Sequence, residues 1–254
     1  MKDFTLDMYS EYLKAIKSTI GNFIRIDEYM TAHTKPDHFC IVRHDIDRRA
    51  YNALKIAKLE ANLGIKAVYY FRSKPNIFKP DMIQEIESLG HEIGYHYECL
   101  SDTDGDINKA ITLFEKNLEK FRDIVQVRTI SMHGRAFKPY DNRDIWKSKK
   151  NHDLLINKFN ILGEVYLDID YSDIAYINDT GRNWTSNKSN RRDHVDSNIS
   201  ADFNSGKELL TYLSQEPHPK MIFQIHPERW TDKKLEHLIQ FFIDEAGNTI
   251  KSFM

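Results

Sequence analysis

Four apolar segments of the sequence end in histidine and charged side chains, the residue types that hydrolytic enzymes use to bind metals and move protons. The four ends carry His44, Asp45 and Asp47; His96 and Glu98; His133 and Arg135; and His226 and Arg229. Charged side chains are rarely buried unless they are paired or bound to a metal, so these residues need partners. One aspartate and two histidines from separate segments suit zinc, and three protein ligands leave a position open for water or substrate.

The segments that carry these residues are predicted strands, and they alternate with predicted helices. The strands are expected at 38–47, 65–72, 91–98, 127–134, 163–170, 175–180 and 220–227, and the helices at 5–19, 50–64, 79–90, 107–124, 151–159, 205–216 and 231–246. Such alternation is typical of βα units and a mainly parallel sheet. About seven strands favour a closed or nearly closed barrel over an open doubly wound sheet, and no G-x-G-x-x-G or P-loop motif is present. In a parallel barrel the carboxyl ends of the strands meet at one rim, where active sites lie.

The spacing of the acidic residues predicts which side chains share a face of the first strand. Because side chains alternate between the two faces, Asp45 and Asp47 are expected on one face and His44 on the other. Two carboxylates on one face repel each other, and a bound cation would relieve this repulsion. Structural roles stay open for single residues: Asp45 could pair with Arg43 or Arg48, and His44 could bond to the backbone. A structural explanation would have to apply separately to each of the four strands, whereas one shared site explains all of them together. The pattern therefore favours one shared site.

Composition narrows the class of protein. The 254 residues carry a formal charge of -2 and are 41% hydrophobic, which predicts one globular domain over 1–254 with an N-terminal helical extension at about 1–37. This charge gives no reason to expect binding to nucleic acid. Two cysteines without a C-x-x-C motif do not support a cysteine zinc site. No signal sequence or membrane-length apolar window is found, so a cytoplasmic location is expected. The polar segment 181–204 is expected to be a functional excursion near a site, or partly mobile.

In the stretches HDID and GHEIGYHYE the chain resembles the polysaccharide deacetylase family, also called the NodB homology group. The resemblance extends from about residue 38 to residue 230, and the chain is similar to a divergent subgroup associated with bacterial surface-polysaccharide gene clusters. It implies the α/β fold of that family, a distorted (β/α)7 barrel. It also implies that Asp45 is the catalytic base, that Asp47 binds the metal and that His96 is the first metal histidine.

The later motifs of the family match more loosely. SMHGRAFKPYDNRDIW contains Arg135 and Arg143, either of which could supply the arginine that keeps Asp45 ionised, and FQIHPERW places His226 at the catalytic acid. The resemblance therefore implies that Arg143 and His226 are catalytic. The residues assigned to substrate binding are Arg135, Asp179, Trp184 and Trp230.

One position departs from the family pattern. Four residues after His96, where a second metal histidine is expected, the chain has Leu100. Leucine cannot bind a metal, so another residue supplies the third ligand, or the site is weak or empty. His133 is the first candidate because its strand should end at the same rim, Glu98 is the second and His44 the third.

The resemblance implies a hydrolase that contains Zn²⁺ or another divalent transition metal and removes an acetyl or formyl group from an amino sugar. The expected substrate is an N-acyl amino sugar in a nucleotide-linked or lipid-linked glycan, used in O-antigen or capsule biosynthesis. One alternative is a catalytically inactive barrel that binds a sugar or supports a partner. Another is the hydrolysis of a C–N bond in a molecule that is not a sugar.

Overall fold

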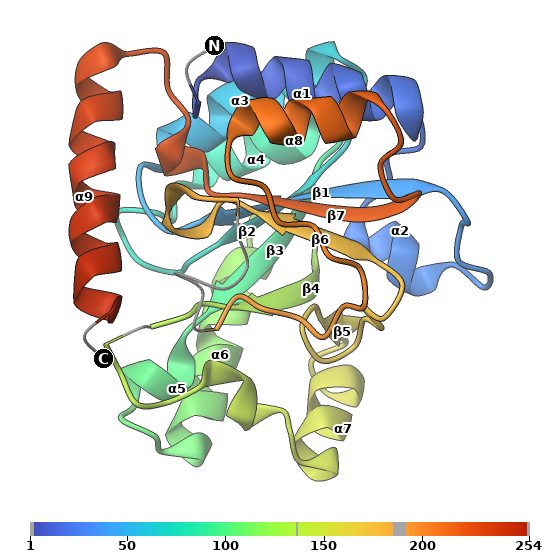
Figure 1. The fold of residues 1–254 in the computed structure, drawn as a ribbon. Helices are drawn as coiled ribbons and strands as arrows, with labels where there is room; N and C mark the ends of the chain where they lie inside the picture. Colours follow the sequence, from blue (N-terminus) through green and yellow to red (C-terminus); the bar gives the residue numbers. More distant parts are fainter. Residues whose placement is uncertain (1–2, 136, 185–191, 253–254) are drawn as a thin grey trace.

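Seven parallel strands form one sheet that curls into an incomplete barrel (Figure 1). The computed structural model describes residues 3–135, 137–184 and 192–252. The strands, in chain order, are β1 Phe39–Ile46, β2 Val68–Phe71, β3 Glu92–Tyr97, β4 Val127–Met132, β5 Gly163–Glu164, β6 Ala175–Asn178 and β7 Lys220–Ile225. Their order across the sheet is β5-β4-β3-β2-β1-β7-β6, which leaves β5 and β6 as the two edges. The predicted α/β fold, a distorted (β/α)7 barrel, is confirmed.

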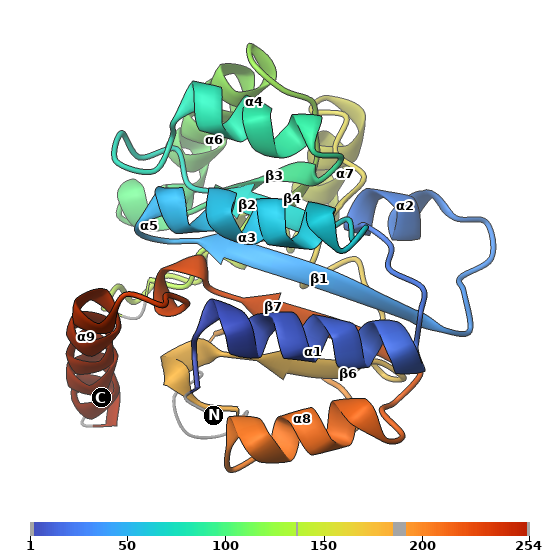
Figure 2. The ribbon, with the colours of Figure 1, turned by 90° about the horizontal axis from the view of Figure 1, so that it is seen from above.

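Helices cover the outer face of the curled sheet. The helices are α1 Leu6–Thr19, α2 Ile26–Thr31, α3 Ala50–Asn62, α4 Pro80–Ser88, α5 Cys99–Asp102, α6 Ile107–Arg122, α7 Lys149–Asn157, α8 Gly206–Ser214 and α9 Lys234–Ser252, with short 3-10 helices η1 Asn142–Ile145, η2 Thr180–Arg182 and η3 Pro227–Arg229. Seen from above, α4 with α6 behind it lies along one end of the sheet, and α3, α1 and α8 follow, whereas α2 lies near the amino end of β1 and α9 near its carboxyl end (Figure 2). The carboxyl rim is therefore bordered by α9.

The two faces of β1 pack into different parts of the core, as its two-residue period predicts. Cys40 and Val42 belong to the large apolar cluster between the sheet and the outer helices. Phe39 and Ile41 belong to a second cluster, which also contains Tyr70 and fills the barrel toward its amino end. The inner face of β1 thus begins with apolar side chains, and its later inward positions are those that carry charge.

The N-terminal helix is part of the core. Tyr9 and Tyr12 of α1 are fully buried in the large cluster, and α1 packs beside α8. None of the described helices is long and apolar enough to cross a membrane.

The region after β4 differs from the sequence prediction. The strand expected at 163–170 has only two residues. The reason is the buried carboxylate of Glu164, which accepts the backbone N–H groups of Tyr166 and Leu167 and thereby turns the chain. The short helices α2 and α5 were not predicted, and α9 extends beyond its expected end at residue 246.

Candidate metal centre

Alternate residues of β1 lead from the apolar interior to the rim. Arg43 and Asp45 face inward, and Asp47 follows directly after the strand ends. His44 points outward, where its Nε2 lies 2.7 Å from Oε1 of the fully buried Glu60 on α3. The expectation that His44 points away from Asp45 is therefore confirmed, and its place as a third-choice metal ligand is wrong.

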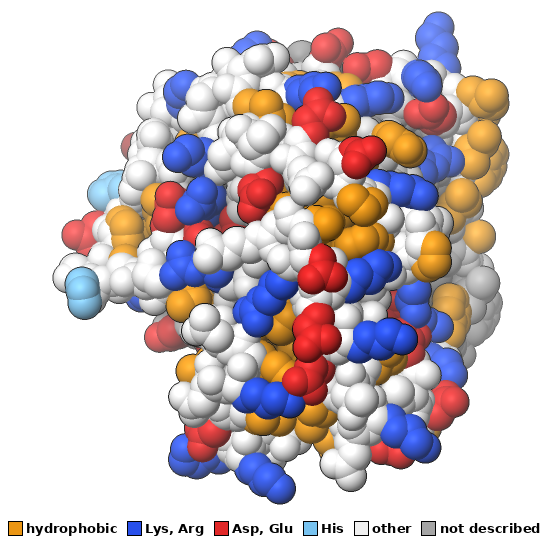
Figure 3. Space-filling model, turned by 180° about the vertical axis from the view of Figure 1, so that it is seen from behind, with side chains coloured by type: hydrophobic (Ala, Val, Ile, Leu, Met, Phe, Trp, Pro, Cys, Tyr) orange, Lys and Arg blue, Asp and Glu red, His pale blue; other side chains and the backbone are white. Residues whose placement is uncertain are grey.

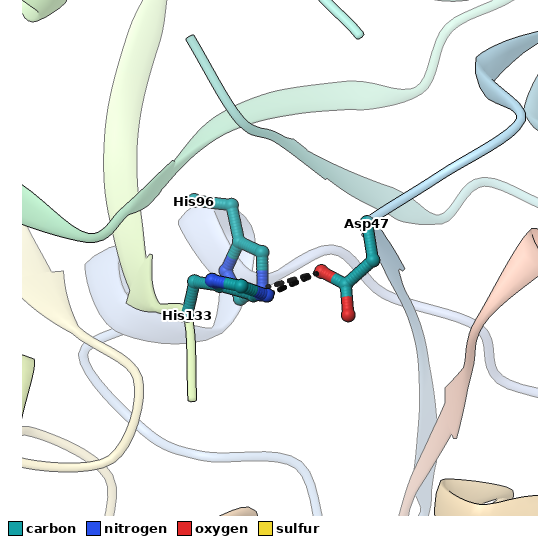
Figure 4. Close-up of side chains that lie close together, drawn as sticks. All are labelled: Asp47, His96 and His133. Carbon is teal, nitrogen blue, oxygen red and sulfur yellow. Dashed lines mark ion pairs between the residues drawn. The ribbon is translucent and has the colours of Figure 1, made fainter. Parts of the chain in front are cut away.

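Three of the predicted residues converge at the rim (Figure 4). Asp47 Oδ1 lies 3.4 Å from Nε2 of His96 and 3.2 Å from Nε2 of His133. The three ligand atoms all lie within 4.8 Å of one another. β1 and β4 are separated by two strands, which in a flat sheet would place their ends about 14 Å apart. The curvature of the sheet is therefore what brings Asp47 and His133 together.

The other ring nitrogen of each histidine is held by a hydrogen bond. Nδ1 of His96 donates to the carbonyl oxygen of Ser131 at 3.0 Å, and Nδ1 of His133 donates to Oε2 of Glu98 at 3.1 Å. These bonds direct both Nε2 atoms toward Asp47, as is usual for metal-binding histidines. Glu98, the second choice for a ligand, instead orients His133 and is itself held by Arg72, whose guanidinium lies 2.7 Å away.

The chemistry of this cluster fits a divalent cation. Asp47 Oδ1 is buried and receives no hydrogen bond from the described residues, although two imidazole nitrogens face it. Burial raises the pKa of Asp47, but His133 and His96 outweigh it and hold that pKa well below its usual range. Burial lowers the pKa of His133, but Asp47 and Glu98 reverse this and raise it to about 9. A positive charge at this point satisfies the carboxylate, either as a protonated imidazole or as a divalent metal bound by two neutral imidazoles and one carboxylate.

Asp45 lies beside this cluster and is fixed in its ionised form. Arg43 donates to it through Nε at 3.0 Å and through Nη2 at 2.7 Å, and Gln224 donates to the Oδ2 atom at 2.8 Å. Burial raises the pKa of Asp45, but the charges of Arg43 and His96 lower it below its ordinary value. Oδ2 of Asp45 lies 3.7 Å from Nε2 of His96.

The arginine that holds Asp45 is a different one from those that the resemblance implies. Arg143 binds Asp141 at 2.6 Å, and Arg135 binds Glu98 at 2.8 Å. Arg43 takes this position because it lies two residues before Asp45 on the same strand and therefore faces the same way. Of the structural roles left open for Asp45, pairing with Arg43 is the one observed.

His226 projects from the end of β7 and is oriented by Asp179. Its Nδ1 lies 2.6 Å from Oδ1 of Asp179. The same Oδ1 accepts a hydrogen bond from Arg229, and Oδ2 accepts one from the indole of Trp230. Burial and the charge of Arg229 lower the pKa of His226, but Asp179 outweighs both and raises it above its ordinary value. β1 and β7 are neighbouring strands, and His44 pairs with Ile225, so the next residues along the two strands, Asp45 and His226, lie near each other at the rim. The charge of His226 helps to lower the pKa of Asp45.

Three residues predicted to bind substrate have structural positions instead. Asp179 is fully buried and positions His226, so its assignment to substrate is wrong. Trp184 and Trp230 are 4% and 1% exposed, and neither ring offers a face to a sugar. Both pack against Phe4 at the start of the chain, with ring centroids 5.5 Å and 5.2 Å apart.

Arg135 and the polar segment lie near the rim. Arg135 is 32% exposed at its side chain and stays a candidate for contact with substrate. Arg192 donates to the carbonyl oxygens of Arg135, Lys138 and Tyr140, so the later part of the segment 181–204 returns to the loop after β4. This placement agrees with an excursion near the site; residues 185–191 of the segment lie outside the described residues.

Sequence reasoning missed two polar residues inside the barrel. The side chain of Gln224 donates to Asp45, and the hydroxyl of Ser131 accepts a hydrogen bond from Arg43. Gln224 and Ser131 each precede a predicted histidine by two residues. The same period-two argument that grouped the aspartates would have placed them on the inner face.

Comparison with known proteins gives similarity only among solved structures. No family model and no curated protein matches the chain. A family 4 carbohydrate esterase from Bacillus anthracis is 12% identical, with 94% of this chain and 85% of that chain covered and a TM-score of 0.39. The catalytic domain of a peptidoglycan N-acetylglucosamine deacetylase from Eubacterium rectale is 12% identical, with coverages of 84% and 86% and a TM-score of 0.44.

A third similar structure is a family 4 carbohydrate esterase pseudoenzyme from Bacillus anthracis, which is 12% identical, with 82% of this chain and 60% of that chain covered and a TM-score of 0.42. Two of these three similar structures are described as carbohydrate esterases or pseudoenzymes of family 4, and the third as a peptidoglycan deacetylase. The reaction of the present chain does not follow from identities this low.

Proposed function

We propose that this protein is a metal-dependent hydrolase that removes an N-acyl group, acetyl or formyl, from an amino sugar. The observation that carries the proposal is the convergence of Asp47, His96 and His133, with two Nε2 atoms turned toward one carboxylate oxygen. This ligand set suits Zn²⁺ or another divalent transition metal and leaves coordination positions open. Asp45 and His226 supply an ionised carboxylate and an imidazole beside it.

Each of these side chains has a role in amide hydrolysis. A divalent cation held by the three ligands would polarise the amide carbonyl group and make the attacking water more acidic. Asp45, kept ionised by Arg43, receives the proton of the attacking water. His226 donates a proton from Nε2 to the departing nitrogen, because an unprotonated amine is a poor leaving group. Asp179 fixes the ring through Nδ1 and stabilises its charged form.

We place the substrate among N-acyl amino sugars of nucleotide-linked or lipid-linked glycans, in the cytoplasmic stage of O-antigen or capsule biosynthesis. The motif resemblance supports this choice. A second support is Arg135, a partly exposed cation two residues after His133, which could contact an anionic carrier group.

Metal analysis tests the proposal most directly. The purified protein is expected to carry stoichiometric metal, and His96→Ala and His133→Ala are expected to lose it while keeping the circular dichroism spectrum of the parent. The matched control is His33→Ala, which removes an exposed histidine that precedes β1 and therefore lies at the opposite end of the barrel from the rim.

Activity is then measured as release of acetate or formate from N-acylated oligosaccharides and from nucleotide-linked N-acyl amino sugars. Release is expected to stop in chelator and to return with Zn²⁺. Metal-replete protein that releases no acyl group from any of these substrates would contradict the proposal.

Leu100 favours a second candidate, a barrel that binds a sugar or supports a partner without hydrolysis. Leu100 is 3% exposed in α5 and occupies the position where the resemblance implies a ligand. A protein that stays metal-free in excess Zn²⁺, keeps its fold and binds oligosaccharide without releasing an acyl group would support this candidate.

A further inference from the structure

The helix α9 has its polar side chains turned inward and its apolar side chains turned outward. Its buried residues include His237, Gln240 and Asp244. Nine large hydrophobic side chains are exposed in the described part of the chain, and six of them belong to α9. These six are Leu235 at 70%, Leu238 at 51%, Ile239 at 43%, Phe241 at 41%, Phe242 at 61% and Ile243 at 41% exposed. A helix on the surface of a monomer normally has the opposite polarity.

Polar contacts attach the inner face of α9 to the rim. His237 Nε2 lies 2.8 Å from Nη2 of Arg182, which donates to it. Asp244 accepts a hydrogen bond from Gln240 at 3.0 Å and lies 3.7 Å from Nε of Arg229. The helix therefore stays on the barrel through its charged and polar residues, and its apolar residues contribute little to that attachment.

The outward residues form one continuous stripe. Leu235, Leu238, Ile239 and Phe242 follow the spacing i, i+3, i+4 and i+7, which places them side by side on one face of a helix. Figure 3 shows hydrophobic side chains gathered along the edge of the molecule that α9 occupies. An apolar patch of this kind on a folded protein marks an interaction surface.

The charges at the two ends of the stripe indicate what covers it. Lys234 precedes the stripe and Glu245 follows it, and both are exposed. If two copies of α9 pack antiparallel about a two-fold axis near Ile239, Lys234 of each copy lies opposite Glu245 of the other. A parallel arrangement would instead place like charges together. A lipid surface would favour a basic polar face, whereas lysine and glutamate balance each other here.

We propose that the outer face of α9 is the interface of a two-fold homodimer in which the α9 helices of two copies pack antiparallel. An isologous interface uses the same patch on both copies, so one self-complementary stripe is sufficient. The interiors of homodimer interfaces are more apolar than other protein surfaces, as this stripe is. The inference does not depend on the proposed hydrolase activity.

Sedimentation velocity of the full chain over a concentration series tests the proposal. The wild type is expected to dimerise, and Phe242→Glu is expected to weaken the dimer by more than about a hundredfold in Kd, because it buries a charge at an apolar contact. The control Ile107→Glu changes an isoleucine that is 40% exposed at the start of α6 and is expected to leave the dimer unchanged. Circular dichroism confirms that each variant is folded.

A charge exchange tests the antiparallel arrangement. Lys234→Glu alone and Glu245→Lys alone are each expected to weaken the dimer by a few fold, and the double variant to restore it. A wild type that is monomeric at all concentrations, a dimer that Phe242→Glu leaves intact, or single and double variants that weaken the dimer alike would each overturn the proposal. Binding of a monomeric wild type to anionic vesicles would overturn it in favour of a lipid surface.

Discussion

Replacing Arg43 by methionine is expected to destabilise the fold strongly, because it leaves a charge buried without its partner. Arg43 and Asp45 are each 1% exposed and share two hydrogen bonds, at 3.0 Å and 2.7 Å. Methionine keeps the apolar volume of the arginine stem but provides no cation. Breaking a buried pair of this kind costs about 3–5 kcal/mol. The free energy of unfolding of Arg43→Met is therefore expected to fall by about that amount near neutral pH.

The double variant Arg43→Met/Asp45→Asn separates the lost charge from the lost volume. It removes both charges, so most of the stability is expected to return, leaving a deficit of about 1–2 kcal/mol because Ser131 and Tyr166 lose their hydrogen bonds to the guanidinium. Urea unfolding of chelator-treated protein measures these differences without a contribution from bound metal.

The pH dependence of the loss gives a second test with a defined sign. In the wild type the pKa of Asp45 is lowered, so its contribution to stability is present above the ordinary carboxyl pKa and is lost as pH falls through the lowered value. Arg43→Met removes the largest of the charges that lower this pKa, so burial raises the pKa of Asp45 relative to the wild type and the folded variant binds the proton more readily than the folded wild type does. The loss in Arg43→Met is therefore expected to be smaller at about pH 5.5 than at about pH 8. A loss below about 1 kcal/mol, as for an exposed pair, or one that is independent of pH would refute the reasoning.

Two further predictions concern positioning residues. Asp179→Asn removes the charge that raises the pKa of His226. The alkaline limb of the kcat–pH profile is therefore expected to move to lower pH. A limb that does not move would contradict a role for His226 as the acid. Glu60→Gln is expected to reduce the free energy of unfolding by about 2–3 kcal/mol, because Glu60 accepts hydrogen bonds from Tyr9 and Tyr69 and pairs with His44. Metal content is expected to stay unchanged in Glu60→Gln, since Glu60 and its partners lie on the outer face of β1 and the candidate metal ligands lie at the inner rim. Loss of metal in Glu60→Gln would contradict this separation of the two clusters.

Local patterns in the sequence were sufficient for the architecture and for part of the site. Alternation of apolar strands with amphipathic helices predicted the parallel sheet. A strand buried on both faces leaves a short continuous apolar run, whereas a helix buried on one face leaves apolar residues three or four positions apart. The two-residue period of β1 predicted that Asp45 and Asp47 turn away from His44. The short strand β5 was overestimated because the turn after it depends on the buried carboxylate of Glu164, which no local pattern reveals.

The sequence by itself determined which residue types reach the carboxyl rim, because strand ends and the alternation of side chains are local properties of the chain. Only the tertiary structure decided that His133 meets Asp47 across two intervening strands, because the curvature of the sheet sets that distance. It also decided that Trp184 and Trp230 are buried, because the N-terminal segment, distant in sequence, packs over them. Distances between strands and coverage by remote segments are properties of the whole fold, and no spacing along the chain contains them.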